Sequence, residues 1–310
     1  MNNYICIDGG TTNTRITVVT SGKIADKEFI SMGSKDNIDS NGKFKAEIKR
    51  GIEELINRNS LKLQQISAVI ASGMITSEYG LKEVPHVKAP AGIKELKNGL
   101  VKAEFGEICD IPFYFIPGVI LKNGELQTDM MRGEETEIMG LLGEFSTDCA
   151  FLLPGSHSKL ITLDSSGRID TIKTFLSGEM LSAIAQNTIL KAAVDIKRED
   201  FDGEYLLKGY ETSRLCGLNE ALFKTRILNT VYKKDTLQCY SFYLGAIFAC
   251  EIEALKKCGR KKVVIGGRTV LKKPICYLLE KMTDLTVLPV NENLADNCTA
   301  FGAVRIFESA

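Results

Sequence analysis

The chain has 310 residues, and its 39 Lys and Arg balance its 39 Asp and Glu, so it carries no formal net charge at pH 7. A neutral balance provides no bulk attraction to nucleic acids or membranes and favours small-molecule partners. Nine scattered cysteines without a C-x-x-C pair, and only two histidines, argue against a zinc site and for reduced thiols. We therefore expect a soluble cytoplasmic protein.

Along the chain, short β-branched segments that end at glycine, proline or a polar turn alternate with segments of helical spacing. Strands are predicted at 4–8, 15–22, 67–73, 113–119, 150–155, 159–167, 263–267 and 285–290. Helices are predicted at 46–59, 179–194, 237–259 and, with many small residues, 294–307. This alternation predicts an α/β protein.

The first predicted strand ends in the stretch ICIDGGTTNTRI, residues 5–16, which has more turn residues than a strand end needs. Glycine lets backbone N–H groups approach an anion closely, and threonine and asparagine add further donors. The stretch is neither a Walker A sequence nor G-x-G-x-x-G. A phosphate-binding turn fits it best: Gly9, Gly10, Thr11, Thr12 and Asn13 would contact phosphate, and Asp8 would hold Mg²⁺ through water.

The chain also resembles itself at an offset of 145 residues. GTTNTRITVVTSGKI begins at Gly10 and GSHSKLITLDSSGRI begins at Gly155, with 6 of 15 positions identical and no gap. Chance similarity between two hairpins is the alternative. The repeat predicts two domains, 1–145 and 146–310, each opening with a strand-turn-strand hairpin, and two turns that face one cleft as a phosphate clamp.

These residues carry a resemblance. IDGGTTNTR, LLPGSHSKL and VVIGGRTVLKKP resemble the two phosphate motifs and the adenosine motif of the sugar-kinase, hexokinase and actin superfamily. Together with GMITSEYG, APAG and MRGEETEIMG, they resemble the 2-keto-3-deoxygalactonate kinase family. The resemblance implies two ribonuclease-H-like domains with an interdomain cleft. It also implies ATP-dependent phosphorylation of the 6-hydroxyl of a sugar acid, with Mg²⁺ as cofactor.

Further ATP contacts follow from the resemblance. They are expected at Gly155, Ser156, His157, Lys159, Gly266 and Gly267. The second phosphate motif has Pro154 and His157 where many relatives have further glycine and threonine. A strand-to-helix turn is the simpler interpretation of Gly266 and Gly267.

Glu134 and Glu135 open a predicted helix, where the helix dipole already favours acids. The resemblance instead implies a catalytic base here. We assign that role to Glu134 and keep Glu135 as the second candidate, with Asp8 completing the catalytic set.

Arg132 is expected either to bind the sugar acid's carboxylate or to pair with a nearby acid. Thr76, Ser77 and Arg15 are the other candidates for substrate binding, whereas His86 is expected to serve in packing or at the surface.

Two alternatives to this function remain: a kinase for another small sugar or sugar acid, and a non-catalytic ATP-dependent sensor or assembly protein. The oligomeric state is open, with a homodimer among the possibilities.

Overall fold

The computed structural model describes residues 2–39, 42–267 and 269–309. By their contacts the residues form two units. Unit 1 comprises Met1–Thr147, Leu163–Ile172 and Asp296–Ala310, and unit 2 comprises Asp148–Thr162 and Lys173–Ala295. These units are discontinuous in sequence, whereas the sequence predicts one boundary after residue 145, and that functional division stays a prediction.

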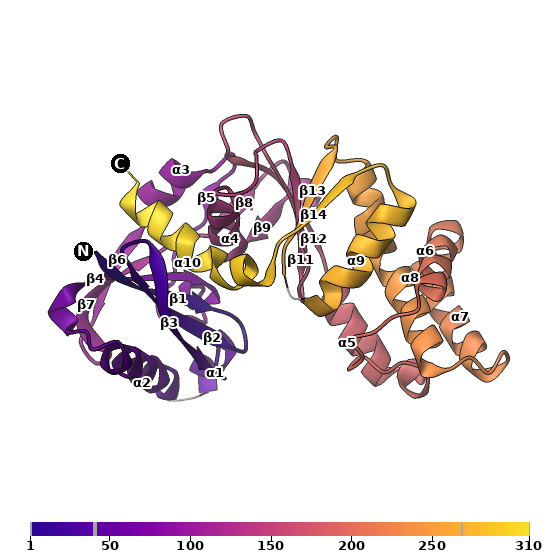
Figure 1. Ribbon diagram of the computed structural model, residues 1–310, viewed down its shortest axis with the longest axis horizontal. Coiled ribbons are helices and arrows are strands. Elements are labelled where there is room, and N and C mark those ends of the chain that lie inside the picture. Colours follow the sequence, from indigo (N-terminus) through magenta and orange to yellow (C-terminus); the bar gives the residue numbers. More distant parts are fainter. Residues whose placement is uncertain (1, 40–41, 268, 310) are drawn as a thin grey trace. The chain divides into compact units, whose positions relative to one another are not determined.

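Unit 1 is built on a six-stranded sheet in the order β3-β2-β1-β4-β7-β6 (Figure 1). Its strands are β1 (Asn3–Gly9), β2 (Thr14–Thr20), β3 (Lys23–Ile30), β4 (Ile66–Gly73), β6 (Val101–Phe105) and β7 (Cys109–Phe115). Strand β1 runs antiparallel to β2 and parallel to β4. The parallel neighbours bring the ends of β1 and β4 to the same edge of the sheet.

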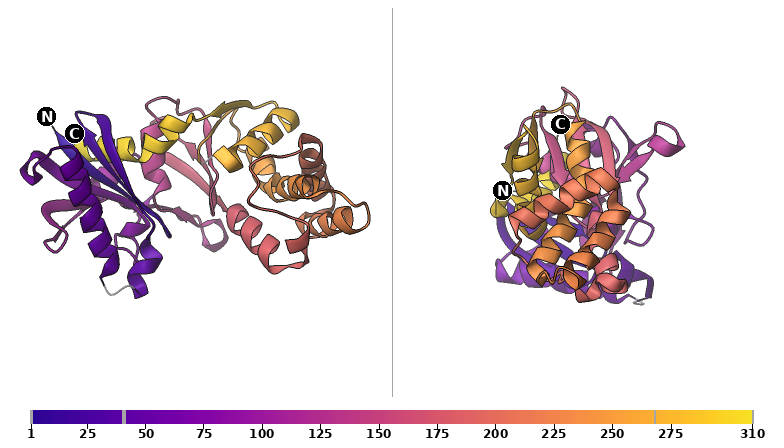
Figure 2. Two further views of the ribbon diagram at one scale, coloured as in Figure 1. Left: turned by 60° about the horizontal axis from the view of Figure 1, so that its bottom comes forward. Right: turned by 90° about the vertical axis from the view of Figure 1, so that its right-hand side faces the viewer.

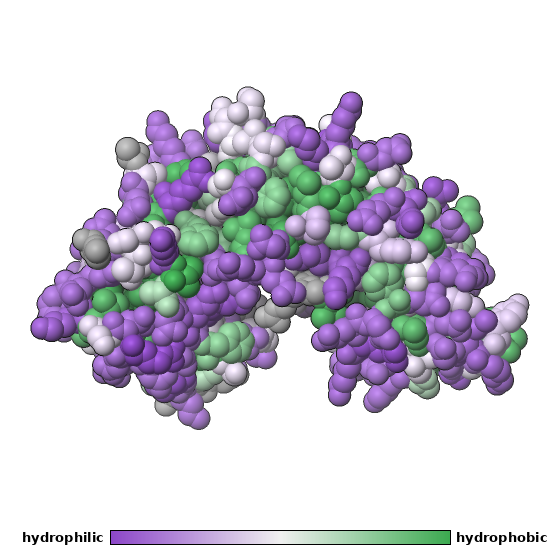
Figure 3. Space-filling model, in the orientation of Figure 1, coloured by the Kyte–Doolittle hydropathy of each residue, from purple (hydrophilic) through white to green (hydrophobic). Residues whose placement is uncertain are grey.

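Helix α2 (Lys43–Arg58) covers one face of this sheet. Its apolar residues recur at helical spacing, so Phe44, Ile48, Ile52 and Leu55 are fully or almost fully buried against the sheet. The opposite face of α2 is charged, and it forms a hydrophilic surface over this helix (Figure 3).

The remaining elements of unit 1 include a three-stranded sheet in the order β5-β8-β9. They are α1 (Ser34–Asp39), β5 (Val87–Lys88), α3 (Ile93–Asn98), β8 (Val119–Leu121), β9 (Asp129–Met131), α4 (Glu134–Leu141) and the 3-10 helices Leu63–Gln65, Met74–Thr76 and Glu125–Gln127. The helix α10 (Glu292–Glu308) follows unit 2 in the chain, and its later turns lie beside β1 (Figure 2). There the Tyr4 hydroxyl donates to Glu308.

Unit 2 has a five-stranded sheet in the order β12-β11-β10-β13-β14. Its elements are β10 (Ala150–Leu153), β11 (Ser158–Leu163), β12 (Ile169–Phe175), whose first residues are counted with unit 1, α5 (Ser177–Asn187), the 3-10 helix Ile189–Ala192, α6 (Gly203–Cys216), α7 (Leu218–Thr230), α8 (Thr236–Lys256), β13 (Lys262–Ile265), α9 (Thr269–Met282) and β14 (Thr286–Pro289). Helix α8 contributes many residues to its apolar core, where Leu244, Phe248 and Ile252 belong to one buried cluster with residues of β10 and β13.

The two sheets share one topology. In each, three consecutive strands lie side by side and two parallel strands follow, so β10-β11 occupies the place of β1-β2, while β6 is an additional antiparallel edge strand of the first sheet. Both predicted strand-turn-strand segments are therefore antiparallel hairpins, as expected from the repeat. Within the described residues, no helix combines the length and the apolar character that crossing a membrane requires.

Candidate active site

The ends of β1 and β4 meet at two glycines. Asp8 is in register with Ser72 and Gly9 with Gly73. Gly73 has φ 82°, and a Cβ there would lie 2.6 Å from the Gly9 carbonyl oxygen and 3.5 Å from Asp8 Oδ1. Only glycine fits this backbone. The half-buried Asp8 carboxylate is thereby fixed at the edge of the sheet.

The turn after β1 is closed by a hydrogen bond from Gly10 N–H to the Asn13 carbonyl at 2.8 Å. The start of α1 supports it, because Ser34 N–H donates to the Gly10 carbonyl at 3.0 Å. Thr11 and Thr12 are exposed at the tip of the turn. Their side chains can thus be reached by a ligand, as a phosphate-binding turn requires, and the Thr12 hydroxyl accepts from the Asn13 amide at 3.1 Å.

Helix α4 begins beside the same strand end. Its N-cap, Gly133, has φ 112°, and a Cβ there would lie 3.1 Å from Gly73 Cα. This close approach places the first turn of α4 against the end of β4, next to the end of β1. The structure therefore brings Asp8, Glu134 and Glu135, which are far apart in sequence, to one region of unit 1.

The two glutamates of α4 differ in their surroundings. Glu135 is fully buried, and both of its carboxyl oxygens accept the Gly133 N–H at 2.8 Å. Burial, reinforced by the neighbouring Glu134, raises the pKa of Glu135 to about 8, against the opposing effect of its hydrogen bonds. Glu134 is half-buried and accepts the Arg132 N–H at 3.1 Å. Of the two, only Glu134 has an exposed surface that a substrate can contact.

The Arg132 guanidinium is bound to the loop that follows β4. One of its nitrogens donates to the carbonyl and hydroxyl of Thr76 at 2.8 and 2.6 Å. Another donates to the Val84 carbonyl at 3.0 Å and lies 3.3 Å from His86 Nδ1. Burial and the Arg132 charge lower the pKa of His86 to about 4, so this histidine is neutral at pH 7. His86 was expected only to pack or lie at the surface, and its contact with Arg132 was not foreseen.

The remaining substrate candidates are held by local bonds. Thr76 is buried and donates to the Gly73 carbonyl at 3.0 Å, and Ser77 donates to the Met74 carbonyl at 2.7 Å. Arg15 is in register with Asp8 across the hairpin, and its guanidinium lies 3.9 Å from Asp296. These residues border the strand ends, but only Arg15 presents a partly exposed charge.

In unit 2 the turn after β10 is held by the start of α5. Glu179 N–H donates to the Ser156 carbonyl at 3.1 Å, and Gly178 packs so closely on the Gly155 carbonyl that a side chain there would collide with it. His157 is exposed, with Nε2 at 3.5 Å from a Glu179 carboxylate oxygen. Gly155 itself has open space where a Cβ would project.

Lys159 and the glycines after β13 complete this region. Lys159 is buried and donates to the Thr174 hydroxyl at 2.7 Å. Gly266 N–H donates to the Leu152 carbonyl at 2.9 Å. Gly267 has φ 71°, and a Cβ there would lie 2.6 Å from the Pro154 carbonyl oxygen. The turns after β10 and β13 are therefore neighbours, which brings together the predicted second phosphate motif and adenosine motif.

Asp8 fits a metal that arrives with a nucleotide. Among the described residues, no group of three or more His, Cys, Asp or Glu could hold a metal ion on its own. Mg²⁺ typically binds one or two carboxylates together with substrate phosphates and keeps several waters. A single half-buried carboxylate beside an exposed glycine-rich turn matches that requirement.

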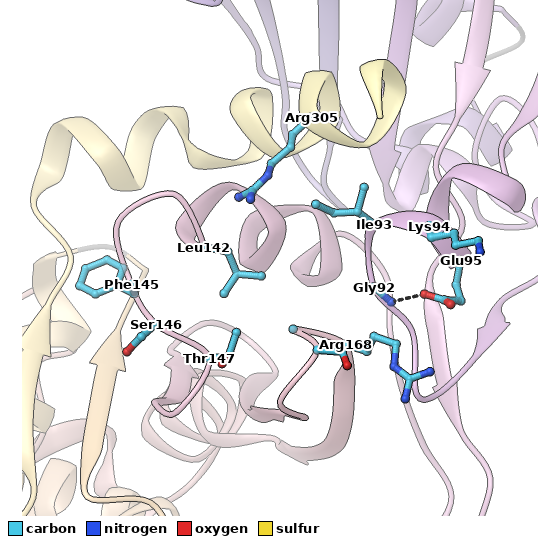
Figure 4. A pocket seen from close by; sticks show the side chains of 12 residues that line it. Gly92, Ile93, Lys94, Glu95, Leu142, Phe145, Ser146, Thr147, Arg168 and Arg305 are labelled. Carbon is cyan, nitrogen blue, oxygen red and sulfur yellow. Dashed lines mark hydrogen bonds between the residues drawn. The ribbon is translucent and has the colours of Figure 1, made fainter. Parts of the chain in front are cut away.

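Unit 1 also contains an open pocket of about 500 Å³ (Figure 4). It lies between the start of α3, the end of α4, the β11-β12 turn and Arg305 of α10. Arg305 donates to the Met139 carbonyl at 3.1 Å. None of the candidate site residues lines this pocket, so we assign it no part in the reaction.

Comparison with known proteins gives a consistent result. A family model described as 2-keto-3-deoxy-galactonokinase matches residues 8–306. A 2-dehydro-3-deoxygalactonokinase of Escherichia coli (strain K12) is 22% identical over 255 residues, covering 82% of this chain and 80% of that protein. A Rhizobium meliloti (strain 1021) protein named "Probable 2-dehydro-3-deoxygalactonokinase" is 31% identical over 127 residues, covering 41% and 40%.

Solved structures show the fold. A Sinorhizobium meliloti protein with the 2-dehydro-3-deoxygalactonokinase name superposes with a TM-score of 0.81 at 20% identity, covering 98% of this chain and 97% of that one. The ADPNP-bound activator of 2-hydroxyisocaproyl-CoA dehydratase from Clostridium difficile gives a TM-score of 0.53 at 14% identity, covering 98% and 93%. The predicted α/β fold of the hexokinase and actin type, with two mixed sheets, is confirmed.

Proposed function

This chain belongs to the 2-keto-3-deoxy-galactonokinase family, and we propose roles in catalysis or binding for its candidate site residues. It is an ATP-dependent kinase of 2-keto-3-deoxygalactonate. The position of the phosphorylated oxygen, the metal and the roles of individual residues are proposals. They rest on the geometry at the ends of β1 and β4 and at the start of α4.

Glu134 is the general base in this proposal. Its carboxylate accepts the proton of the sugar acid's 6-hydroxyl while that oxygen attacks the γ-phosphorus and the bond to ADP breaks. The observation that carries this assignment is the contrast in burial, because Glu134 is half-buried and Glu135 is fully buried. Glu135 instead binds the Gly133 N–H with both oxygens and so fixes the first turn of α4.

The two glycine-rich turns bind the nucleotide. The turn of Gly10–Asn13 and the turn at Gly155 offer backbone N–H groups and hydroxyls to phosphate oxygens. The turn at Gly267, adjacent to Pro154, accommodates the adenosine. Asp8 would hold Mg²⁺, which when bound neutralises charge on the transferring phosphoryl group.

Arg132 positions the substrate loop. Its four contacts to Thr76, Val84 and His86 tie residues 76–86 to the start of α4. The half-buried cation also provides a favourable potential for the carboxylate of the sugar acid. Direct binding of that carboxylate by Arg132 stays a prediction, with Arg15 as the partly exposed alternative cation.

Matched glutamine variants test the base. Glu134→Gln keeps the shape and hydrogen-bonding capacity of the side chain, so nucleotide and sugar-acid binding should persist while kcat falls by about 10²–10⁴-fold. Glu135→Gln should lower kcat less. Little loss of kcat in Glu134→Gln would remove this residue from the mechanism.

The substrate assignment needs its own assay. ADP release, coupled to a spectroscopic readout and screened over a panel of sugar acids, should be fastest with 2-keto-3-deoxygalactonate. NMR of the product should show phosphate on O6. Faster turnover of another sugar acid would change the substrate assignment to that acid.

We also propose a cytoplasmic location, supported by nine free cysteines, and a homodimer, which sedimentation can test.

A further inference from the structure

Glu251 is a buried acid in the apolar core of unit 2. It lies on α8, and its side chain has no solvent exposure. Its helical neighbours Phe248, Ile252 and Leu255 are all fully buried members of that core. An ionised carboxylate in such a place is costly unless a cation or several hydrogen bonds compensate it.

Two serine hydroxyls lie close enough to this carboxyl to affect its pKa. Burial raises the pKa of Glu251 to about 7, while Ser177 and Ser158 oppose that rise. Within the described part of the chain, neither hydroxyl meets either carboxyl oxygen at hydrogen-bond geometry, so both oxygens lack a partner. The group is therefore poised between its acid and carboxylate forms near pH 7.

Both serines belong to the structure that holds the second phosphate turn. Ser158 opens β11, and its hydroxyl accepts the Gly155 N–H at 3.5 Å. Ser177 opens α5, whose next two residues contact Gly155 and Ser156. Glu251 thus lies behind the two segments that set the geometry of this turn.

The surrounding charged groups do not neutralise Glu251. No charged side chain of the described residues contributes to the shift of its pKa. Titratable groups on the neighbouring elements include Cys239, Tyr240, Tyr243, Cys250, Glu253 and Lys256 on α8, Tyr210 on α6, Lys272 and Cys276 on α9, Lys159 on β11, Glu179 on α5 and His157 in the turn. Several of these are engaged elsewhere: Lys272 with the Val290 carbonyl, Lys159 with Thr174, and Lys256 with Glu253 and Tyr210.

We propose that Glu251 is a positioning residue for the second phosphate turn, acting as a neutral carboxylic acid that bridges the hydroxyls of Ser158 and Ser177 when nucleotide is bound. The acid form can donate its proton to one hydroxyl and accept from the other. A nucleotide phosphate at Gly155 disfavours a second negative charge behind the turn, so binding is coupled to proton uptake. This inference rests on the proposed role of the turn in binding phosphate.

Proton uptake provides a direct test. The binding of a non-hydrolysable ATP analogue with Mg²⁺ is measured by calorimetry at pH 7.5, in two buffers of different ionisation enthalpy. The wild-type enzyme should take up a fraction of a proton that Glu251→Gln does not. Its affinity should also weaken by about fourfold between pH 6.5 and 8 if binding raises the pKa by about one unit, whereas Glu251→Gln should lose that additional pH dependence.

Two further variants show whether the proton is taken up at Glu251 or at His157, and whether Glu251 acts on ATP binding alone. His157→Gln removes the other titratable side chain of the turn and should leave the part of the uptake that depends on Glu251. Glu251→Leu removes the bridge and should raise KM for ATP while KM for the sugar acid is unchanged. The same proton uptake in wild type and Glu251→Gln would overturn the proposal. So would equal losses for ATP and the sugar acid in Glu251→Leu.

A separate variant tests whether the turn at Gly155 binds phosphate at all. Gly155→Val adds a side chain into open space, so the fold should tolerate it, but the side chain would occupy the phosphate position. Unchanged analogue binding in Gly155→Val would contradict phosphate binding at this turn, and would overturn the role of Glu251 with it. Weakened binding in Gly155→Val together with an unaffected Glu251→Gln would contradict the role of Glu251 alone.

Discussion

Replacing Glu135 by glutamine should make the protein's stability less dependent on pH. In the wild type the pKa of this group is 4.5 in an unfolded chain and about 8 in the folded protein. A raised carboxyl pKa means that the stability contribution is fully present below pH 4.5 and is lost as pH rises to about 8. At about 1.4 kcal/mol per pKa unit, the loss from Glu135 over this window is at most about 5 kcal/mol.

The variant keeps the acceptor that the Gly133 N–H requires. In Glu135→Gln the amide oxygen can still accept this N–H, while the ionisable group is gone. At pH 5 the variant should be less stable than the wild type, because the amide NH₂ replaces the second oxygen that also accepts from Gly133. At pH 9 the stability of the variant should rise relative to that of the wild type, because the variant contains no buried charge at this position.

The assay is chemical denaturation of both proteins at several pH values between 5 and 9. The quantity of interest is the difference in unfolding free energy between variant and wild type, in which the titration of Glu251 and other shared groups cancels. A difference that does not change with pH would refute the reasoning. It would show that Glu135 is already ionised in the folded protein at pH 5.

Three further predictions concern the ends of β1 and β4. Asp8→Asn should leave the thermal midpoint nearly unchanged and lower turnover strongly at limiting Mg²⁺, and near-normal turnover there would assign Asp8 to the turn alone. Arg132→Ala should raise KM for the sugar acid far more than KM for ATP, whereas equal losses with acid and neutral analogues would exclude a role in reading the carboxylate. Gly73→Ala should destabilise the protein by about 1–3 kcal/mol in urea titrations, because its φ of 82° and the nearby Gly9 carbonyl leave no room for a Cβ. If Gly73→Ala has the same urea midpoint as the wild type, the ends of β1 and β4 can move apart to accommodate a Cβ.

The fold was largely readable from the sequence because the signals are local. The strand at 67–73 was predicted from its β-branched and small residues, and the structure has β4 at Ile66–Gly73. The helix at 237–259 likewise corresponds to α8 at Thr236–Lys256. The repeat at Gly10 and Gly155 correctly indicated that the two hairpins would take equivalent places in two sheets.

The environments of the site residues were less readable, because they depend on contacts between distant segments. Glu134 and Glu135 are adjacent in sequence, and only the packing of α4 on Gly73 makes one buried and the other half-buried. The bond between Arg132 and His86 joins residues that are 46 positions apart.

Glu251 did leave a signal in the sequence. It falls at helical spacing with Leu244, Phe248 and Leu255, which places it on the apolar stripe of α8. An acid on such a stripe is unusual. Sequence alone could not have identified the two serines that face it, since Ser158 and Ser177 belong to other elements.

The packing of α10 on α4 has a consequence for how the protein is made. Helix α10 meets α4 through Gly140, which touches the Cys298 carbonyl, and Gly302, which touches the Thr136 carbonyl. During translation, the ribosome must synthesise all of unit 2 before it reaches Cys298 and Gly302 of α10. The helix that carries Glu134 therefore remains uncovered on one side while unit 2 emerges. The helix of the proposed base therefore acquires its complete packing only after the second unit has been synthesised.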